Sequence, residues 1–224
     1  MDRHIPGEAL DREKTMPIIQ WPTSVKQARS FQAGLDQLVE RKRIPDGLRI
    51  MPPLPVYNIG FRDVVMSSGL DVAGKLVSWR YFAGGDSAET TVSGDIDLSA
   101  NPRLTSLAYG KQVFEAFTAF KKTLATKLAE KSLANVDFEP RLLRFPSLLL
   151  ECLWTIPLRP PGAARGDDWV LPYHKPTNDF DLDSSVLYRG EDLFQTLQVF
   201  VGKERAKSRQ PNILPKGPPP HALA

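Results

Sequence analysis

The sequence is poor in the two residue types that most often bind metals or act as nucleophiles and bases. Its 224 residues include one cysteine, Cys152, and three histidines, His4, His174 and His221. These residues cannot form a four-cysteine zinc site within one chain, nor a site of two cysteines and two histidines. A single cysteine also excludes an intramolecular disulfide, so nothing favours an oxidising compartment, and we expect a cytoplasmic protein.

Long apolar runs and glycine-rich phosphate-binding motifs are also absent. No stretch of about 18 or more apolar residues could span a membrane, and the charges of both signs that follow Met1 are unlike a signal peptide. The pair Gly84-Gly85 is typical of a hairpin turn, and the glycine motifs of P-loops and dinucleotide-binding turns do not occur. The sequence therefore predicts no membrane association, no cofactor and no metal.

The chain does contain enough apolar material for a core, and its charge is unevenly distributed. Hydrophobic residues make up 42% of it, and its length fits one large domain or two small ones. The formal net charge of +3 is too small to indicate nucleic-acid binding by itself. Most of the excess is local, since the segment 203–209 and Lys216 together contribute five basic residues against one acid.

The hydrophobic patterns predict an α+β fold, an antiparallel sheet covered by a long amphipathic helix, with extended arms at both ends. Helical spacing starts at Ser24, where Ser24 and Gln27 match a capping box, and stops at Pro45. Residues 48–98 have the β-branched and aromatic content of strands and include a hairpin. The remaining expected elements are a long helix from about 103 to 134, strands at 141–145, 148–156 and 168–171, and a last helix from Gly190 to about Lys203.

The two ends of the chain differ from its middle in composition. Residues 1–23 contain three prolines and no sustained period, which is typical of an extended arm. Residues 24–204 form the predicted single α+β domain, and residues 205–224 form a basic, proline-rich tail that cannot bury enough surface to fold alone. An alternative division separates two small subdomains around Asn135.

Three acids form the candidate group for an enzymatic function. Asp95 and Asp97 are two residues apart in a predicted strand, so both carboxylates should project from one face of it. That spacing suits an acid and base pair or a divalent cation, although it is also typical of a solvated strand face. With Glu151 as a third member, the group suggests a carboxylate-dependent hydrolase or transferase.

A second acidic pattern is incomplete. Asp179, Asp181 and Asp183 match the opening of a calcium-binding loop. However, Ser184 stands where the loop requires glycine, and Gly190 stands where it requires a bidentate glutamate. We therefore expect an acidic loop before a helix and no dedicated calcium site.

Cys152 and His174 could in principle act as a nucleophile and its base, since such partners are often distant in sequence. The apolar residues around Cys152 instead indicate a buried thiol, whose pKa is raised and which is inert. The sequence therefore predicts a structural role for Cys152.

No complete catalytic constellation occurs, and the two arms are the kind of segment that becomes ordered on a partner. The sequence therefore favours a non-enzymatic protein-binding subunit or accessory factor of a larger assembly. The tail residues expected to contact a protein partner are Arg205, Lys207, Arg209, Ile213, Leu214 and Lys216. Two alternatives remain: the carboxylate enzyme that uses Asp95, Asp97 and Glu151, and a nucleic-acid accessory protein that acts through the basic tail.

Overall fold

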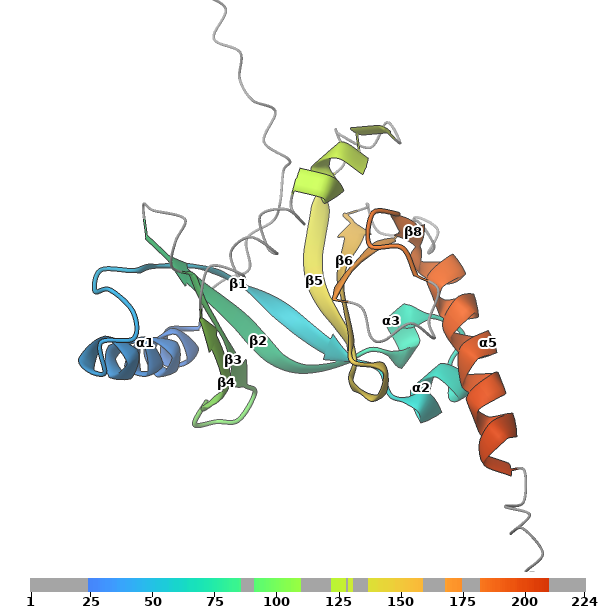
Figure 1. Ribbon diagram of the computed structural model, residues 1–224, viewed down its shortest axis with the longest axis horizontal. Helices are drawn as coiled ribbons and strands as arrows, with labels where there is room; N and C mark the ends of the chain where they lie inside the picture. The colour runs from blue at the N-terminus through green and yellow to red at the C-terminus, as the bar shows by residue number, and fades with distance from the viewer. Residues whose placement is uncertain are drawn as a thin grey trace, which may run out of the picture.

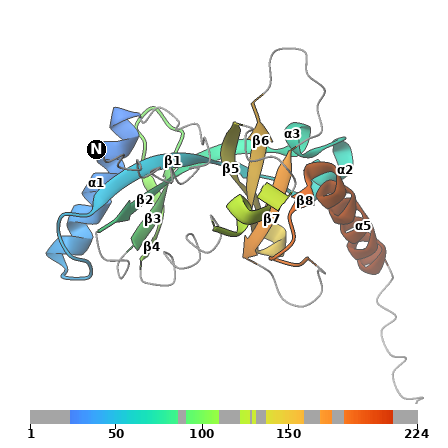
Figure 2. The same ribbon diagram turned by 90° about the horizontal axis from the view of Figure 1, so that it is seen from above.

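The computed structural model describes residues 24–85, 91–109, 122–127, 129–130, 137–158, 168–174 and 182–209. In this part of the chain, eight strands form one sheet in the order β4-β3-β2-β1-β5-β6-β7-β8 (Figures 1 and 2). The strands are β1 Arg49–Asn58, β2 Lys75–Gly84, β3 Thr91–Asp97, β4 Leu104–Tyr109, β5 Phe138–Phe145, β6 Leu150–Pro157, β7 Trp169–His174 and β8 Tyr188–Arg189. The helices are α1 Val25–Glu40, α2 Phe61–Met66, α3 Leu70–Ala73 and α5 Gly190–Arg209, with a 3₁₀ turn at Pro146–Leu148 and further helical residues at 122–127 and 129–130. The expected combination of helices with a mostly antiparallel sheet is confirmed.

The middle of the sheet is its least continuous part. Every neighbouring pair of strands is antiparallel except β1 and β5, which are parallel and match at only three positions, Val56 with Leu142, Tyr57 with Leu143 and Asn58 with Arg144. On its other side, β1 pairs with β2 from Arg49 to Asn58, except at Pro52 and Pro53, where the register shifts. The sheet therefore consists of two groups of strands, β4 to β1 and β5 to β8, joined by a short parallel ladder.

Prolines explain why this ladder is short. β1 contains Pro52, Pro53 and Pro55, and extending the parallel register by two residues would place Leu54 opposite Pro140 of β5. Proline has no N–H to donate to a neighbouring strand, so it is confined to edges, strand starts and bulges. The pairing of β1 with β5 begins at Val56, directly after the last of these prolines.

The four named helices cover one face of the sheet at its two ends (Figures 1 and 2). α1 packs Phe31 and Leu35 against a core that includes Tyr81 of β2. A Cβ at Gly94 of β3 would lie only 2.9 Å from the Phe31 ring, so glycine at this position permits the close approach of α1. α2, α3 and α5 pack on β5 to β7 through a second core, which contains Val64, Leu70, Leu143, Cys152, Trp154, Leu193, Phe194 and Leu197.

A third core lies on the opposite face and crosses the junction between β1 and β5. It contains Leu54 and Val56 of β1 and, from the other group of strands, Leu142, Leu153 and Leu171. Leu124, in the helical residues 122–127, belongs to this core and is fully buried. Residues 110–121, 128 and 131–136 lie outside the described part, so a single long covering helix stays a prediction there.

The expected start of that helix near residue 103 is wrong. Residues 104–109 form β4, which pairs antiparallel with β3. The turn between these strands is held by Asp97, whose Oδ1 accepts hydrogen bonds from the backbone N–H groups of Ser99 and Arg103, each at 3.1 Å. The apolar residues Leu104 and Leu107 fit a helical period, but pairing with β3 overrides that local pattern.

Helix ends also differ from expectation. α1 begins where predicted, but Ser24 makes no side-chain cap, so the predicted capping box is wrong. α2 and α3 interrupt residues 48–98, for which only strands were expected. α5 begins at Gly190 as predicted and continues to Arg209, past the expected domain boundary at residue 204. The predicted arm at residues 1–23 and the tail beyond Arg209 lie outside the described residues.

Candidate functional site

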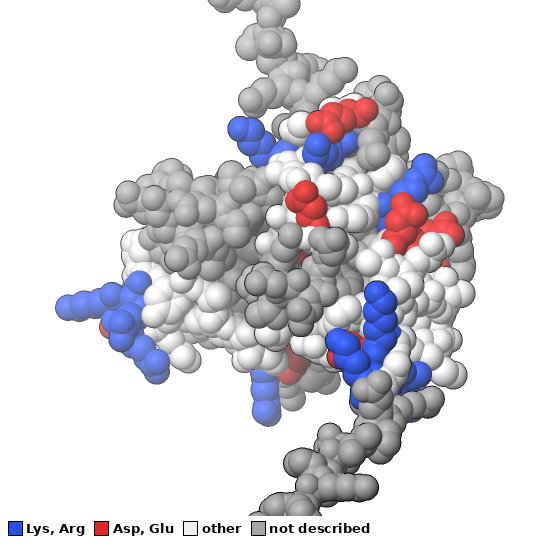
Figure 3. Space-filling view, turned by 45° about the vertical axis from the view of Figure 1, so that its right-hand side comes forward, with Lys and Arg blue, Asp and Glu red and all other residues white. Residues whose placement is uncertain are grey.

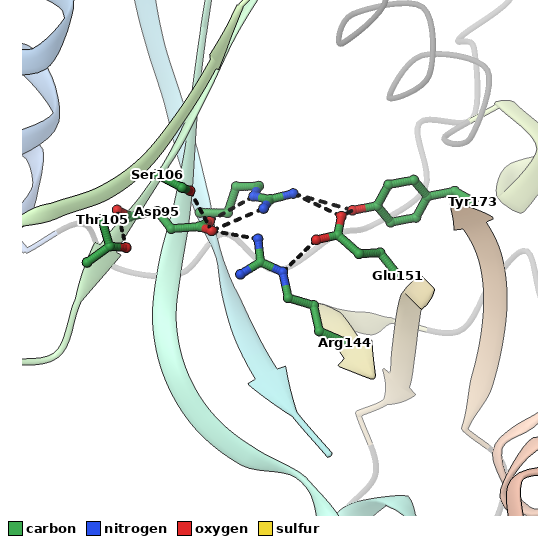
Figure 4. A network of polar contacts seen from close by, with 7 residues as sticks. Asp95, Thr105, Ser106, Arg144, Glu151 and Tyr173 are labelled. Atoms are coloured by element: carbon green, nitrogen blue, oxygen red, sulfur yellow. Dashed lines mark hydrogen bonds and ion pairs between the residues drawn. The ribbon is translucent and has the colours of Figure 1, made fainter. Parts of the chain in front are cut away.

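Two of the three candidate carboxylates meet on the face that carries Leu54 and Val56. Asp95 projects from β3 and Glu151 from β6, and two arginines link them, Arg80 of β2 and Arg144 of β5 (Figure 4). Each of the four charged side chains contacts two of opposite charge. We call this closed arrangement of Arg80, Asp95, Arg144 and Glu151 the charge ring.

Arg80 contributes the most directional contacts of the ring. Its Nε donates to Asp95 Oδ1 at 2.8 Å and its Nη2 to Asp95 Oδ2 at 3.1 Å, a bidentate geometry. Its Nη1 donates to Glu151 Oε2 at 3.2 Å and to the Tyr173 hydroxyl oxygen at 3.4 Å. One guanidinium therefore connects β3 with β6 and β7.

Arg144 closes the ring from the other side. Its Nη2 donates to Asp95 Oδ2 at 2.5 Å and its Nε to Glu151 Oε1 at 2.6 Å. Ser106 Oγ of β4 donates to Asp95 Oδ2 at 2.8 Å, and the Tyr173 hydroxyl of β7 donates to Glu151 Oε2. All four carboxylate oxygens therefore accept at least one hydrogen bond.

These contacts require a curved sheet. On a flat sheet β2 and β7 would be about 19 Å apart, because four strand spacings of about 4.8 Å separate them. Arg80 and Tyr173, which lie on these two strands, are nevertheless within hydrogen-bonding distance. The sheet therefore curls toward this face. Of the seven neighbouring strands from β4 to β7 in the sheet order, all except β1 contribute a side chain to this network (Figure 4).

The ring is largely withdrawn from water. The exposed fractions of its side chains are 3% for Asp95, 15% for Arg80, 19% for Arg144 and 25% for Glu151. Burial alone would lower the pKa of Arg80, but Tyr173, Asp95 and Glu151 outweigh this effect and raise it. Burial and then the negative charge of Glu151 raise the pKa of Tyr173 well above its ordinary value, so its hydroxyl remains a proton donor.

Asp97, the third candidate acid, does not join the ring. Its carboxylate accepts hydrogen bonds from Ser99 Oγ and from two backbone N–H groups of the β3–β4 turn. The Ser99 hydroxyl and then the Arg103 N–H lower the pKa of Asp97, so it stays ionised and stabilises the turn. Of the three candidate acids, Asp95 and Glu151 therefore lie in one network, and Asp97 lies outside it.

The ring includes residues that were not among the candidates. Arg80 lies in the run Trp79-Arg80-Tyr81, and Arg144 lies between Leu143 and Phe145. Each arginine is flanked by apolar residues in its strand, and a buried charge needs a partner of opposite sign, so this signal was available in the sequence. It does not identify which acids are the partners, and it gives no signal for Tyr173.

A second polar arrangement lies on the helix-covered face. The Arg141 guanidinium lies 4.8 Å from the Tyr57 ring centre and 5.0 Å from that of Trp154. Trp154 Nε1 donates to Asp168 Oδ2 at 2.6 Å. Burial, partly offset by the Trp154 hydrogen bond, raises the pKa of Asp168. The aromatic pair therefore already holds a cation from its own chain.

The remaining sequence candidates have structural roles or lie outside the described residues. Cys152 is fully buried, as predicted, and burial followed by the charge of Glu151 raises its pKa. His174 is the last residue of β7, and its side chain is not described. Of the acidic triplet, Asp179 and Asp181 lie outside the described residues, and Asp183 accepts hydrogen bonds from the N–H and hydroxyl of Ser185.

The residues expected to contact a partner are only partly described. Arg205, Lys207 and Arg209 belong to the last turns of α5, and Lys207 Nζ lies 2.6 Å from Glu204 Oε1. Ile213, Leu214 and Lys216 lie outside the described residues. The structure therefore places the first three on a helix and not on an extended tail.

Comparison with protein-family models, with curated proteins and with solved structures gives no match to this chain. Within the described ranges, none of the helices has the length and apolar character needed to cross a membrane. The same residues contain no group of three or more His, Cys, Asp or Glu side chains arranged to hold a metal ion. Function must therefore be argued from the charge ring and the surface.

Proposed function

We propose that this protein is a non-enzymatic binding protein, a subunit or accessory factor of a larger assembly, which docks on an acidic protein surface through the end of α5. The observation that carries the proposal is the projection of α5 beyond the core. Val201 is buried, none of residues 202–207 is buried, and the helix continues to Arg209.

The projecting end carries the excess charge of the chain. Residues 203–209 contain four basic residues and one acid, a net charge of +3, which equals the formal net charge of the whole protein. The rest of the chain is therefore balanced. Figure 3, in which the right-hand side of Figure 1 is turned forward, shows Lys and Arg side chains gathered on the lower part of that side, where α5 ends.

Helix stability alone gives a weaker explanation of this charge. Basic residues near a helix C-terminus interact favourably with the helix dipole by about 0.3–1 kcal/mol each. The exposed Lys207–Glu204 pair adds little, because exposed ion pairs contribute about 0–1 kcal/mol. These effects account for helix formation, but they require neither four basic residues nor a helix that extends beyond its core.

Protein is favoured over the other classes of partner or substrate. Residues 203–209 contain no aromatic side chain that could stack on a base. For the enzymatic alternative, a general base needs a lone pair directed at its substrate, whereas the oxygens of Asp95 and Glu151 accept hydrogen bonds from Arg80, Arg144 and their neighbours. This arrangement supports a structural role for the two acids.

Affinity capture with charge-reversed variants tests the proposal. The test variant carries Lys203→Glu, Arg205→Glu and Lys207→Glu, and the matched control carries the same charge change on exposed residues of α1 and its end, Lys26→Glu, Arg29→Glu and Arg41→Glu. Both are compared with the native sequence in extract of the source cells with and without nuclease treatment, at low and high salt.

The proposal predicts a protein partner that the native chain and the control capture, that the test variant loses, and whose binding weakens as salt rises. Equal capture by both variants would contradict docking through α5. Loss of binding on nuclease treatment alone would favour the nucleic-acid alternative.

A further inference from the structure

The two edge strands of the sheet, β4 and β8, differ in length. β4 pairs with β3 on one side, and no strand among the described residues pairs with its outer side. Four of its six residues, Thr105, Ser106, Ala108 and Tyr109, are exposed. At the opposite edge, β8 has two residues and leads directly into α5. Within the described part of the chain, the backbone N–H and C=O groups on the outer side of β4 therefore have no strand partner, and another strand can pair with them.

β4 also lacks the features by which proteins usually protect an edge. Its sequence, Leu104-Thr105-Ser106-Leu107-Ala108-Tyr109, contains no lysine, no other charge and no proline. Edge strands are commonly blunted by charged side chains, by proline or by shortness, because an open edge templates pairing with another chain. At the other edge of the same sheet, β8 has only two residues and offers few backbone groups for pairing. The two edge strands of one sheet therefore differ in how well they are protected against pairing with another chain.

We propose that β4 is a self-association edge, which pairs antiparallel with β4 of a second copy of this chain about a two-fold axis. A two-fold axis brings the same strand of each copy together, so a single contact covers the open β4 edge of both copies. An uncharged strand of equal length fits this edge without leaving a charge unpaired, and β4 itself meets that condition.

A register centred on Leu107 keeps like faces of the two sheets together, because it pairs residues of equal parity. It places Leu107 opposite Leu107 of the second copy, Ser106 opposite Ala108, and Thr105 opposite Tyr109. Pairs of a β-branched with an aromatic residue are favourable across strands. The association would extend the eight-stranded sheet of each copy into one continuous sheet.

Cysteine cross-linking tests this register directly. The only native thiol, Cys152, is fully buried, so a disulfide between two copies can be attributed to the introduced cysteine. Under mild oxidation, Leu107→Cys should give a covalent dimer, because the two-fold axis places position 107 of one copy next to position 107 of the other. The exposed pair Thr105→Cys with Tyr109→Cys should do the same and serves if Leu107→Cys fails to fold. Val199→Cys, 58% exposed on α5, is the control for random collision.

Sedimentation of the full chain gives the second measurement. The native protein should show a concentration-dependent dimer. Ala108→Lys should shift it to monomer, because it would place a positive charge from each copy at the interface between the two β4 strands. Val199→Lys should leave the dimer unchanged. A native chain that stays monomeric at all concentrations, a dimer that survives Ala108→Lys, or cross-linking no faster than for Val199→Cys would each overturn the proposal. None of these results depends on docking through α5.

Discussion

Replacing Asp95 with asparagine should destabilise the protein strongly. Asp95 is the most buried charge of the ring, and its carboxylate accepts hydrogen bonds from Arg80, Arg144 and Ser106. Asparagine keeps the shape of the side chain and removes its charge. Two guanidinium groups would then share Glu151 as their only negative partner within the ring.

The expected cost follows from the burial of the group. Removing one partner of a buried ion pair costs about 3–5 kcal/mol, because the charges that remain are still desolvated. Arg80 and Arg144 keep 15% and 19% of their side-chain exposure, so water can partly compensate them. We therefore expect a loss of about 3 kcal/mol, the lower end of that range. For a chain of this length, this corresponds to a fall in Tm of about 6–12 °C.

Urea denaturation followed by tryptophan fluorescence measures this loss, since Trp154 and Trp169 are buried in the sheet. The matched control is Glu40→Gln, which removes the same charge from an exposed position and should change stability by less than about 0.5 kcal/mol. If Asp95→Asn lowers the free energy of unfolding by less than about 1 kcal/mol, the ring stabilises the protein no more than exposed ion pairs do, and the cost expected from its burial is wrong.

A double-mutant cycle distinguishes a direct interaction between Asp95 and Arg144 from a general loss of packing as the cause of the destabilisation. Asp95 and Arg144 are in contact, so Asp95→Asn and Arg144→Gln should be non-additive by about 0.5–3 kcal/mol. Asp95→Asn combined with Lys203→Gln, on the projecting end of α5, should be additive. Equal coupling in both cycles would contradict a direct interaction.

Three further predictions concern the helix-covered face and its glycines. In denaturation experiments, Gly190→Ala should lower the free energy of unfolding by about 1–3 kcal/mol, because the added Cβ would overlap the Asp168 carboxylate. Gly202→Ala, which has open space around it, should instead raise it by up to about 1 kcal/mol. The reverse order of the two effects would contradict the close packing at Gly190. Burial raises the pKa of Asp168 above its ordinary value of 3.8, so the native chain loses stability as pH rises through that raised pKa. Asp168→Asn should therefore match the native Tm below about pH 4 and exceed it toward neutral pH, and a pH-independent difference would contradict this. Cys152 should react with a thiol reagent far more slowly in the native than in the denatured protein, and fast native labelling would show that its thiol is accessible.

The sequence predicts individual elements of this fold better than their arrangement. The strands around Leu143 and Cys152 and the start of α5 follow from local apolar patterns and a helix start signal. The helix predicted from about residue 103 does not start there, because pairing of residues 104–109 with β3 competes with local helical propensity. The parallel contact of β1 with β5 joins strands that are far apart in the chain, and no local pattern specifies such a neighbour.

The candidate site was predictable in its acids and not in its geometry. The sequence offers Asp95 and Glu151 as candidate carboxylates, and both belong to the ring, but the arginines that join them determine what the acids can do. Asp97 was paired with Asp95 because residues two apart on a strand share a face. The β3–β4 turn begins at Asp97 and recruits its carboxylate, and this depends on the hairpin that the sequence analysis missed.

The prolines and the charge ring affect the same junction. Pro55 and Pro140 limit the ladder between β1 and β5 to three pairs, so few backbone hydrogen bonds join the two groups of strands. The ion pairs of Arg80 with Glu151 and of Arg144 with Asp95 both cross from one group to the other. An apolar replacement could match the stability of such a ring, but apolar contacts are not directional. We therefore infer that the ring specifies how the two groups of strands align, which is the information that the short ladder supplies only in part.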